Sequence, residues 1–347
     1  MYRYLLIFII STDAWSFQII RNKSQLLLQA RTCDEVIDLR KSLAEWSIES
    51  SDHKVCPKNK TPVEDKKKQF CNVDITQCVP DHVIKYNGIN PKNAGPNCWN
   101  LALVIKEILP GLRSSTPEEL SFYMKPPLCR ELDSNEERRV GDIGNIKTFD
   151  IIEKNMPIDS HAFLYISDKI VYSKNGESSK SPYVLQSYDD VLNVYGISKG
   201  EKCRTKKTPS LSDCGSTISF FRCISITEYL KNSPEVLSPI LNTFKDIQNF
   251  EKCSIEKLAI NAEPINKQQM YNIIDSISVL TAFLNNEKVN LPKDKELDEK
   301  AAFILGSIQL RLKAINKQLS TTTYQPGTDT FESLSWRFDA AIKSLKK

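Results

Sequence analysis

The sequence has 347 residues, of which 26% are charged, and a formal net charge of +4. Lysines and arginines are interspersed with acidic residues and form no concentrated basic stripe, which argues against a dedicated nucleic-acid-binding protein. The chain is long enough for two or three modules, because domains usually contain about 100 to 200 residues. We therefore expect several structural units and no nucleic-acid partner.

Residues 1–16 have the pattern of a secretion signal peptide. Arg3 precedes an apolar stretch over residues 4–10, and Ala14 and Ser16 place small residues at the two positions that a signal peptidase reads. The apolar stretch is shorter than the roughly 20 residues that span a bilayer, and no later stretch is long and apolar enough to do so. We expect a secreted or periplasmic protein without a transmembrane span.

Residues 17–90 are predicted to form a helical segment that contains cysteines. Apolar residues recur at intervals of three and four over residues 24–46, which predicts an amphipathic helix. The lysine-rich stretch SDHKVCPKNKTPVEDKKKQFC is typical of a loop, and its cysteines are expected to staple it. The turn-forming residues of NGINPKNAGPN mark a boundary near residue 90.

Residues 91–225 combine predicted helices and strands, which indicates an α+β fold. Asn97 can cap a helix that begins at Cys98 and that Pro110-Gly111 stops, and TPEEL has the capping box of a second helix. The runs VGDIGNI, HAFLYI, KIVYS and TISFFRCISI are rich in β-branched and aromatic residues. They predict the strands of one antiparallel sheet.

Residues 226–347 return to helical spacing of apolar side chains. Three such stripes predict the interior of a helical bundle rather than a cofactor site. In one interpretation of the chain, this bundle binds a protein partner. The stripes consist of Met270, Ile273, Ile274, Ile277, Leu280 and Leu284; of Ala301, Ile304, Leu305, Ile308, Leu312 and Ile315; and of Phe331, Leu334, Phe338 and Ala341.

Export makes the ten cysteines informative, because thiols outside the cytosol tend to pair. If Cys98 is free, an odd number of cysteines remains, so at least one more must be unpaired. This parity argues against a free Cys98. Cys98 therefore has three interpretations: half of a disulfide, a buried core thiol, or a nucleophile at the start of a helix.

The nucleophile interpretation rests on the position of Cys98. A helix N-terminus presents free N–H groups and a partial positive charge to the sulfur, which favours the thiolate. The Cys98 N–H would also point toward the place where an oxyanion forms during acyl transfer. Of the three histidines, His161 is the candidate base, because it begins the strand HAFLYI, whereas His53 and His82 lie in loop-like stretches.

At these residues the sequence resembles a known family. GPNCWN resembles the Cys-Trp start of the central helix in papain-fold enzymes, and VGDI followed by HAFLYISDKIVYSKNG resembles the Gly-Asp strand and histidine hairpin of the NlpC/P60 branch. The resemblance covers about residues 92–200, although the usual Asp-Cys-Ser-Gly motif is absent. It implies a papain-like NlpC/P60-type domain over residues 91–225. These families are secreted or periplasmic cysteine peptidases and amidases, many of which cleave peptide bonds in peptidoglycan.

The residue that orients the imidazole has two candidates. By the spacing of the family it is Ser173. A three-residue turn over residues 167–169 instead places His161 opposite Asn175, with Ser173 on the same face. Either side chain can accept the imidazole N–H and fix its tautomer. The alternative is a hairpin end in which both residues only form the turn.

The sequence has no metal-binding or phosphate-binding motif, since it lacks CxxC, HExxH and a glycine-rich loop. We therefore expect neither a metal nor a cofactor. The predicted reaction is acyl transfer to water, in which Cys98 attacks an amide carbonyl and His161 first accepts and then returns the proton. The resemblance implies peptidoglycan stem peptides as the substrate. The alternatives are a disulfide-stabilised secreted binding or structural protein and a catalytically inactive papain-fold relative.

Overall fold

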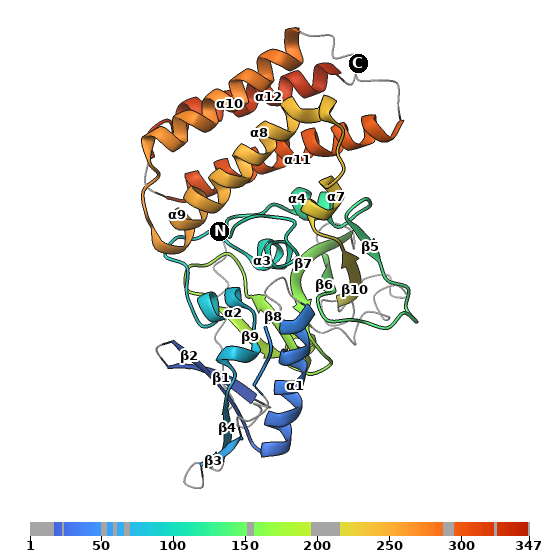
Figure 1. The fold of residues 1–347 in the computed structure, drawn as a ribbon, viewed down its shortest axis with the longest axis vertical. Helices are drawn as coiled ribbons and strands as arrows, with labels where there is room; N and C mark the ends of the chain where they lie inside the picture. Colours follow the sequence, from blue (N-terminus) through green and yellow to red (C-terminus); the bar gives the residue numbers. More distant parts are fainter. Residues whose placement is uncertain are drawn as a thin grey trace.

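The chain is a mixed α+β protein, as expected, with two antiparallel sheets and a group of helices at one end (Figure 1). The predicted signal peptide, residues 1–16, lies outside the described residues. The computed structural model describes residues 17–22, 24–49, 54–57, 61–65, 70–150, 156–195, 216–286, 295–322 and 325–345.

A small sheet and one helix form the N-terminal end. The sheet has the order β1-β2-β4-β3, and helix α1 (Cys33–Glu49) packs on β2 and β4. A capping box starts α1, because the Thr32 and Glu35 side chains each accept a hydrogen bond from the backbone N–H of the other residue. The strands are β1 (Phe17–Asn22), β2 (Gln25–Ala30), β3 (Val63–Asp65) and β4 (Phe70–Asp74).

The single helix expected over residues 24–46 is therefore wrong in its first part. Leu26 and Leu28 are fully buried, whereas Gln25 is exposed and Leu27 is half-buried, which is the period of a strand. Two disulfides hold this end, Cys33–Cys71 between α1 and β4 and Cys56–Cys78. The lysine-rich stretch is stapled through its cysteines, as expected.

A larger antiparallel sheet lies at the middle of the molecule, with the order β5-β10-β6-β7-β8-β9. Four of its strands overlap the four runs predicted from the sequence. A disulfide joins Cys129 on β5 to Cys223, its partner on β10. The strands are β5 (Cys129–Glu131), β6 (Ile143–Asp150), β7 (Met156–Tyr165), β8 (Ile170–Lys174), β9 (Tyr183–Ser187) and β10 (Ser216–Cys223).

Each face of this sheet carries a helix. Helix α3 (Cys98–Ile105) packs on β7 and β8, where Ala162 and Leu164 share its hydrophobic clusters. Helix α5 (Tyr188–Tyr195) covers the opposite face, where Phe163 and Tyr165 pack with Tyr188. Because successive side chains of a strand point to opposite faces, those of β7 face α3 and α5 in turn.

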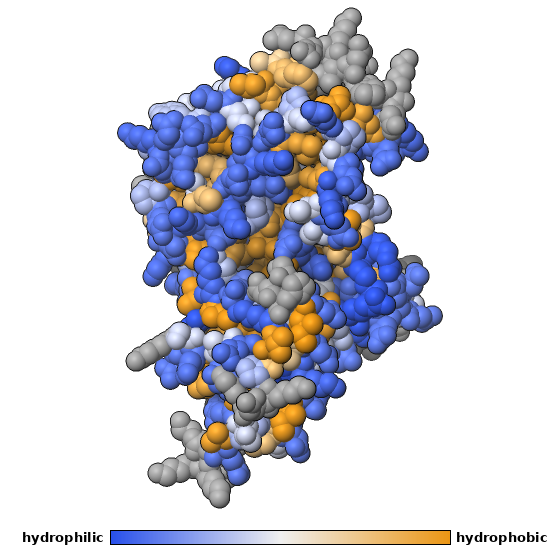
Figure 2. Space-filling view, in the orientation of Figure 1, coloured by the Kyte–Doolittle hydropathy of each residue, from blue (hydrophilic) through white to orange (hydrophobic). Residues whose placement is uncertain are grey.

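Helix α2 packs in the hydrophobic cluster of the N-terminal end, and the remaining helices gather beyond α3 (Figure 1). The three predicted stripes lie on α10, α11 and α12, and their residues are buried. Figure 2 shows hydrophilic residues over much of this end, with hydrophobic residues between them. The elements are α2 (Asp81–Tyr86), α4 (Pro117–Tyr123), α7 (Ile226–Leu230), α8 (Ser238–Phe250), a π-helical turn (Glu251–Ile255), α9 (Glu256–Asn261), α10 (Lys267–Asn286), α11 (Lys295–Ser320) and α12 (Thr328–Leu345), with 3-10 turns at Thr76–Cys78 and Glu235–Leu237.

The helical end shares one hydrophobic core with α3 and α4. A fully buried ion-pair network crosses the same boundary. Arg113 binds Glu119 through two hydrogen bonds of 2.6 and 2.8 Å and Glu251 through one of 2.6 Å, and Arg311 binds the other oxygen of Glu251. None of the helices in the described ranges has the length and apolar composition needed to cross a bilayer.

Candidate functional site

Cys98 is the first residue of α3, as predicted. The Asn97 side chain accepts a 2.9 Å hydrogen bond from the Asn100 backbone N–H and thereby caps the helix. The Asn97 amide also donates to the Ser115 carbonyl, 2.9 Å away, and the Asn100 amide oxygen accepts from the Arg113 N–H at 2.9 Å. These buried contacts fix the start of the helix, and with it the position of the Cys98 sulfur.

The Cys98 thiol is free and buried. Burial raises its pKa to about 11, whereas the nearby backbone N–H groups of Ala162, Trp99 and Cys98 itself, and the charge of the Lys174 ammonium, lower the pKa. Burial removes the thiolate from water and dominates. The site therefore holds a neutral thiol near pH 7, surrounded by groups that would stabilise its anion.

Lys174 is the residue that the sequence analysis missed. Its side chain is buried at the end of β8, and its ammonium donates to the carbonyls of Gly176 and Ser178 at 2.7 and 2.9 Å. Burial lowers its pKa to about 8, against the opposing effects of Cys98 and Glu177. Strand alternation is the signal that could have found it, because Lys174 follows Tyr172 by two positions and so shares the α3 face.

His161 lies on β7 opposite Ile146 of β6 and is fully buried. Its ring stacks on the Tyr195 ring at a centroid distance of 4.7 Å, and neither ring nitrogen has a hydrogen-bond partner among the described residues. Burial lowers the pKa of His161 to about 4. The imidazole is consequently neutral at physiological pH.

The order of residues along β7 determines how close the two predicted groups come. The Cys98 sulfur meets the backbone N–H of Ala162, the residue directly after His161. The His161 ring, however, packs with Phe163 and Tyr195 on the face covered by α5. The structure thus brings Cys98 to the strand that carries His161, without a hydrogen bond between the thiol and the imidazole.

The histidine hairpin has the expected turn. Leu164 pairs with Tyr172 and Tyr165 with Val171, which is the register of a three-residue turn over residues 167–169. The Ser173 hydroxyl is buried and accepts a 2.5 Å hydrogen bond from the Gln186 amide. Asn175 is exposed beyond the end of β8. Neither candidate orienter hydrogen-bonds to the His161 ring in this arrangement.

The other cysteines bear on the parity argument. Six form the three disulfides, and Cys253 is a second free thiol, which is exposed. A free Cys98 is therefore compatible with the even total. Cys203 and Cys214 lie outside the described residues.

The Gly-Asp pair before β6 has a structural role. Asp142 accepts a 2.8 Å hydrogen bond from the Arg139 backbone N–H and forms an ion pair with Arg222 at 2.8 Å. It therefore orders the loop that leads into the sheet. In the part of the chain that the structure describes, no group of three or more His, Cys, Asp or Glu side chains could hold a metal ion.

Comparisons with known proteins identify no relative of this chain. The chain matches no protein-family model, and neither a curated protein nor a solved structure is similar to it at a significant level. The resemblance to papain-fold enzymes consequently rests on the sequence motifs around Cys98 and His161.

Proposed function

We propose that this chain is a secreted or periplasmic cysteine hydrolase that cleaves amide or peptide bonds. The observation that carries the proposal is the position of Cys98, an unpaired thiol at a helix N-terminus, where nearby backbone N–H groups and the Lys174 ammonium lower the pKa of the thiol against the effect of burial. All six cysteines in described disulfides lie elsewhere. Three disulfides also suit an oxidising compartment.

The proposed chemistry is acyl transfer through Cys98. The sulfur forms a bond to the substrate carbonyl carbon, and its proton passes to His161, which then protonates the leaving amine. Water next cleaves the thioester, releasing the acid and restoring the thiol. The N–H groups of Cys98 and Trp99 stabilise the oxyanion, and Lys174 stabilises the thiolate.

This reaction requires a more open arrangement than the one described. Cys98 and His161 are both neutral and buried, and the His161 ring is stacked on Tyr195. Substrate entry has to release the imidazole from Tyr195 and bring it to the sulfur. We infer that the described arrangement is the closed, resting form, with peptidoglycan stem peptides as the substrate class that the sequence resemblance favours.

A second candidate function is a disulfide-stabilised binding protein that retains a papain-like arrangement without catalysis. The absence of any hydrogen-bond partner for either His161 ring nitrogen, within the described ranges, favours it. In this case Cys98 is a core thiol, and the helical end or another surface holds a partner.

One experiment separates the two functions. The native protein is treated with iodoacetamide and each labelled cysteine is identified by mass spectrometry, while amide hydrolysis is measured on peptidoglycan fragments. The hydrolase is expected to label at Cys98 and to lose turnover in Cys98→Ala, whereas Cys253→Ala, which removes the exposed free thiol, keeps it. Turnover that survives Cys98→Ala contradicts the proposal. Labelling confined to other cysteines, without turnover, supports the binding protein, because a buried core thiol is inert. Labelling of Cys98 without turnover indicates a catalytically inactive relative.

A further inference from the structure

A cavity lies at the C-terminal end of α3, opposite the end that carries Cys98. Its volume is about 430 Å³, within the range of roughly 300 to 1,000 Å³ that is usual for small-molecule sites. Helix α3 has eight residues and is therefore about 12 Å long, so this cavity is separate from the Cys98 thiol at its start. Apolar side chains form much of its wall, among them Trp46, Ile105, Val140 and Leu164.

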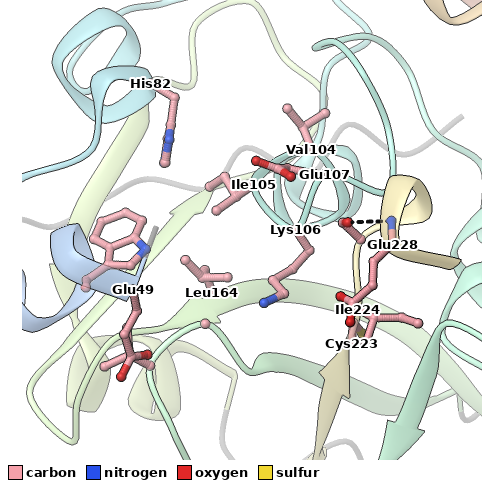
Figure 3. Close-up of a pocket in the computed structure, with 14 residues that line it drawn as sticks. Glu49, His82, Val104, Ile105, Lys106, Glu107, Leu164, Cys223, Ile224 and Glu228 are labelled. Carbon is pink, nitrogen blue, oxygen red and sulfur yellow. Dashed lines mark hydrogen bonds between the residues drawn. The ribbon is translucent and has the colours of Figure 1, made fainter. Parts of the chain in front are cut away.

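Lys106 projects into this cavity from the end of α3. Figure 3 shows its nitrogen directed into the space between Leu164 and Glu228. Within the described residues its ammonium makes no hydrogen bond and no ion pair, although burial lowers its pKa. A Cβ atom on Gly141, whose φ is +86°, would lie 3.3 Å from the Lys106 nitrogen, so the glycine leaves room for the ammonium.

Three carboxylates line the same cavity at its exposed side. Glu49, Glu107 and Glu228 are all exposed, whereas Lys106 is half-buried. The Ser225 side chain accepts a hydrogen bond from the Glu228 backbone N–H at 3.1 Å, which fixes the start of α7 beside the opening (Figure 3). None of the three carboxylates forms an ion pair with Lys106, and Asp142, whose charge acts on the ammonium more strongly than theirs, is itself paired with Arg222. The cavity thus has a positive interior and a negative opening.

This charge pattern restricts the ligand. A simple anion suits the Lys106 ammonium but is repelled by three carboxylates, and a simple cation suits the carboxylates but leaves the ammonium without a partner. A molecule that carries one carboxylate and more than one amino group satisfies both, and its methylene chain can pack on the apolar wall. Such a ligand also fits the excess of negative over positive charges around the cavity.

We propose that this cavity binds a small basic amino acid, with the ligand carboxylate on the Lys106 ammonium and the ligand amino groups on the glutamates at the opening. The proposal does not depend on the hydrolase function, because it uses neither Cys98 nor His161. It assigns the Lys106 ammonium a direct hydrogen-bonded partner, where the described residues provide only the longer-range attraction of Asp142 and the three glutamates.

Isothermal titration of the full chain with L-lysine, and in parallel with L-arginine, tests the site. Pentane-1,5-diamine lacks the carboxylate and glutarate lacks the amino groups, so each is expected to bind roughly tenfold or more weakly than L-lysine, the loss typical of one charge-assisted hydrogen bond. No heat of binding for either amino acid at millimolar concentration overturns the proposal. Equal binding of glutarate and L-lysine also overturns it.

Substitutions locate the ligand in the cavity. Lys106→Met is expected to weaken L-lysine binding roughly tenfold or more while pentane-1,5-diamine binds at least as well as before, because only the carboxylate loses its partner. Lys343→Met removes an exposed lysine on α12 and should change neither. If Lys106→Met does not fold, Glu228→Gln at the exposed opening replaces it and should weaken both amine ligands. Unchanged L-lysine binding in the folded variant contradicts the assignment.

Discussion

Lys174 and Cys98 are both buried, and in their charged forms they are an ammonium and a thiolate that attract each other. The Lys174 ammonium lowers the pKa of the thiol, but burial raises it further, to about 11. An opposite charge nearby usually shifts a pKa by about one unit or more. The residual reactivity of Cys98 therefore depends on the lysine.

We expect Lys174→Met to slow iodoacetamide labelling of Cys98 roughly tenfold near neutral pH, because the thiolate loses its nearest positive charge. Labelling is followed by mass spectrometry of the Cys98 peptide as a function of pH. Lys180→Met, an exposed lysine of the same hairpin region, is the control and should leave the rate unchanged. Equal rates in both variants would show that Lys174 does not act on the sulfur.

His161 should make the stability of the protein depend on pH. Its pKa is about 4 in the folded state, compared with an ordinary value of 6.5, so the unfolded chain binds the proton more tightly. The contribution of neutral His161 is fully present above pH 6.5 and is lost as the pH falls toward 4, by roughly 3 kcal/mol.

The variant His161→Leu tests this dependence. The difference in free energy of unfolding between the parent and the variant should change by roughly 3 kcal/mol between pH 7 and pH 4, because all other groups titrate in both proteins. Denaturant unfolding at several pH values measures it. Parallel stability curves would mean that the pKa of His161 in the folded protein is close to its ordinary value.

At the scale of single elements, the cap of α3 connects stability to the site. Asn97 caps the helix and also donates to Ser115, so Asn97→Ala should cost about 1 to 2 kcal/mol of unfolding free energy and change the labelling rate of Cys98. Thr116 caps α4 in the same way. Thr116→Ala should cost about 1 kcal/mol and leave the labelling rate unchanged. An unchanged labelling rate in Asn97→Ala would show that the cap does not determine the reactivity of the Cys98 thiol.

Sequence patterns predicted the elements whose burial period is regular. The stripe from Met270 to Leu284 lies within α10, and all of the HAFLYI run except Ile166 lies within β7. Strand β2 was missed because QLLLQA has three consecutive apolar residues, which suit either period, and only its pairing with β1 and β4 makes it a strand.

The arrangement of the site depended on contacts that no local pattern contains. The positions of Cys98 and of the hairpin turn followed from capping and turn rules. The direction of the His161 ring depends on α5, because Tyr195 provides the ring on which it stacks. The proximity of Lys174 to Cys98 depends on how α3 packs against β7 and β8, which are distant from it in sequence.

For the whole molecule, the buried network is the feature that makes the helical end and the larger sheet depend on each other. Glu251 lies in the π-helical turn and binds both Arg113 and Arg311, and all of these side chains are fully buried. Buried charges are costly unless they are paired. Removing the shared carboxylate leaves more positive than negative charge in the core.

We expect Glu251→Ala to lower the free energy of unfolding by about 3 to 5 kcal/mol, the usual cost of breaking a buried ion pair from one side. Glu299→Ala, which removes an exposed pair with Lys295 on α11, should cost less than about 1 kcal/mol. Thermal unfolding is followed by circular dichroism for the helices and by tryptophan fluorescence in a Trp336→Phe background, which removes the tryptophan of α12 and leaves Trp46 and Trp99, outside the helical end, as reporters. Because Glu251 holds both parts, the two signals should shift together in Glu251→Ala. A loss confined to the helical signal would mean that the two parts unfold independently and that the network only stabilises the bundle.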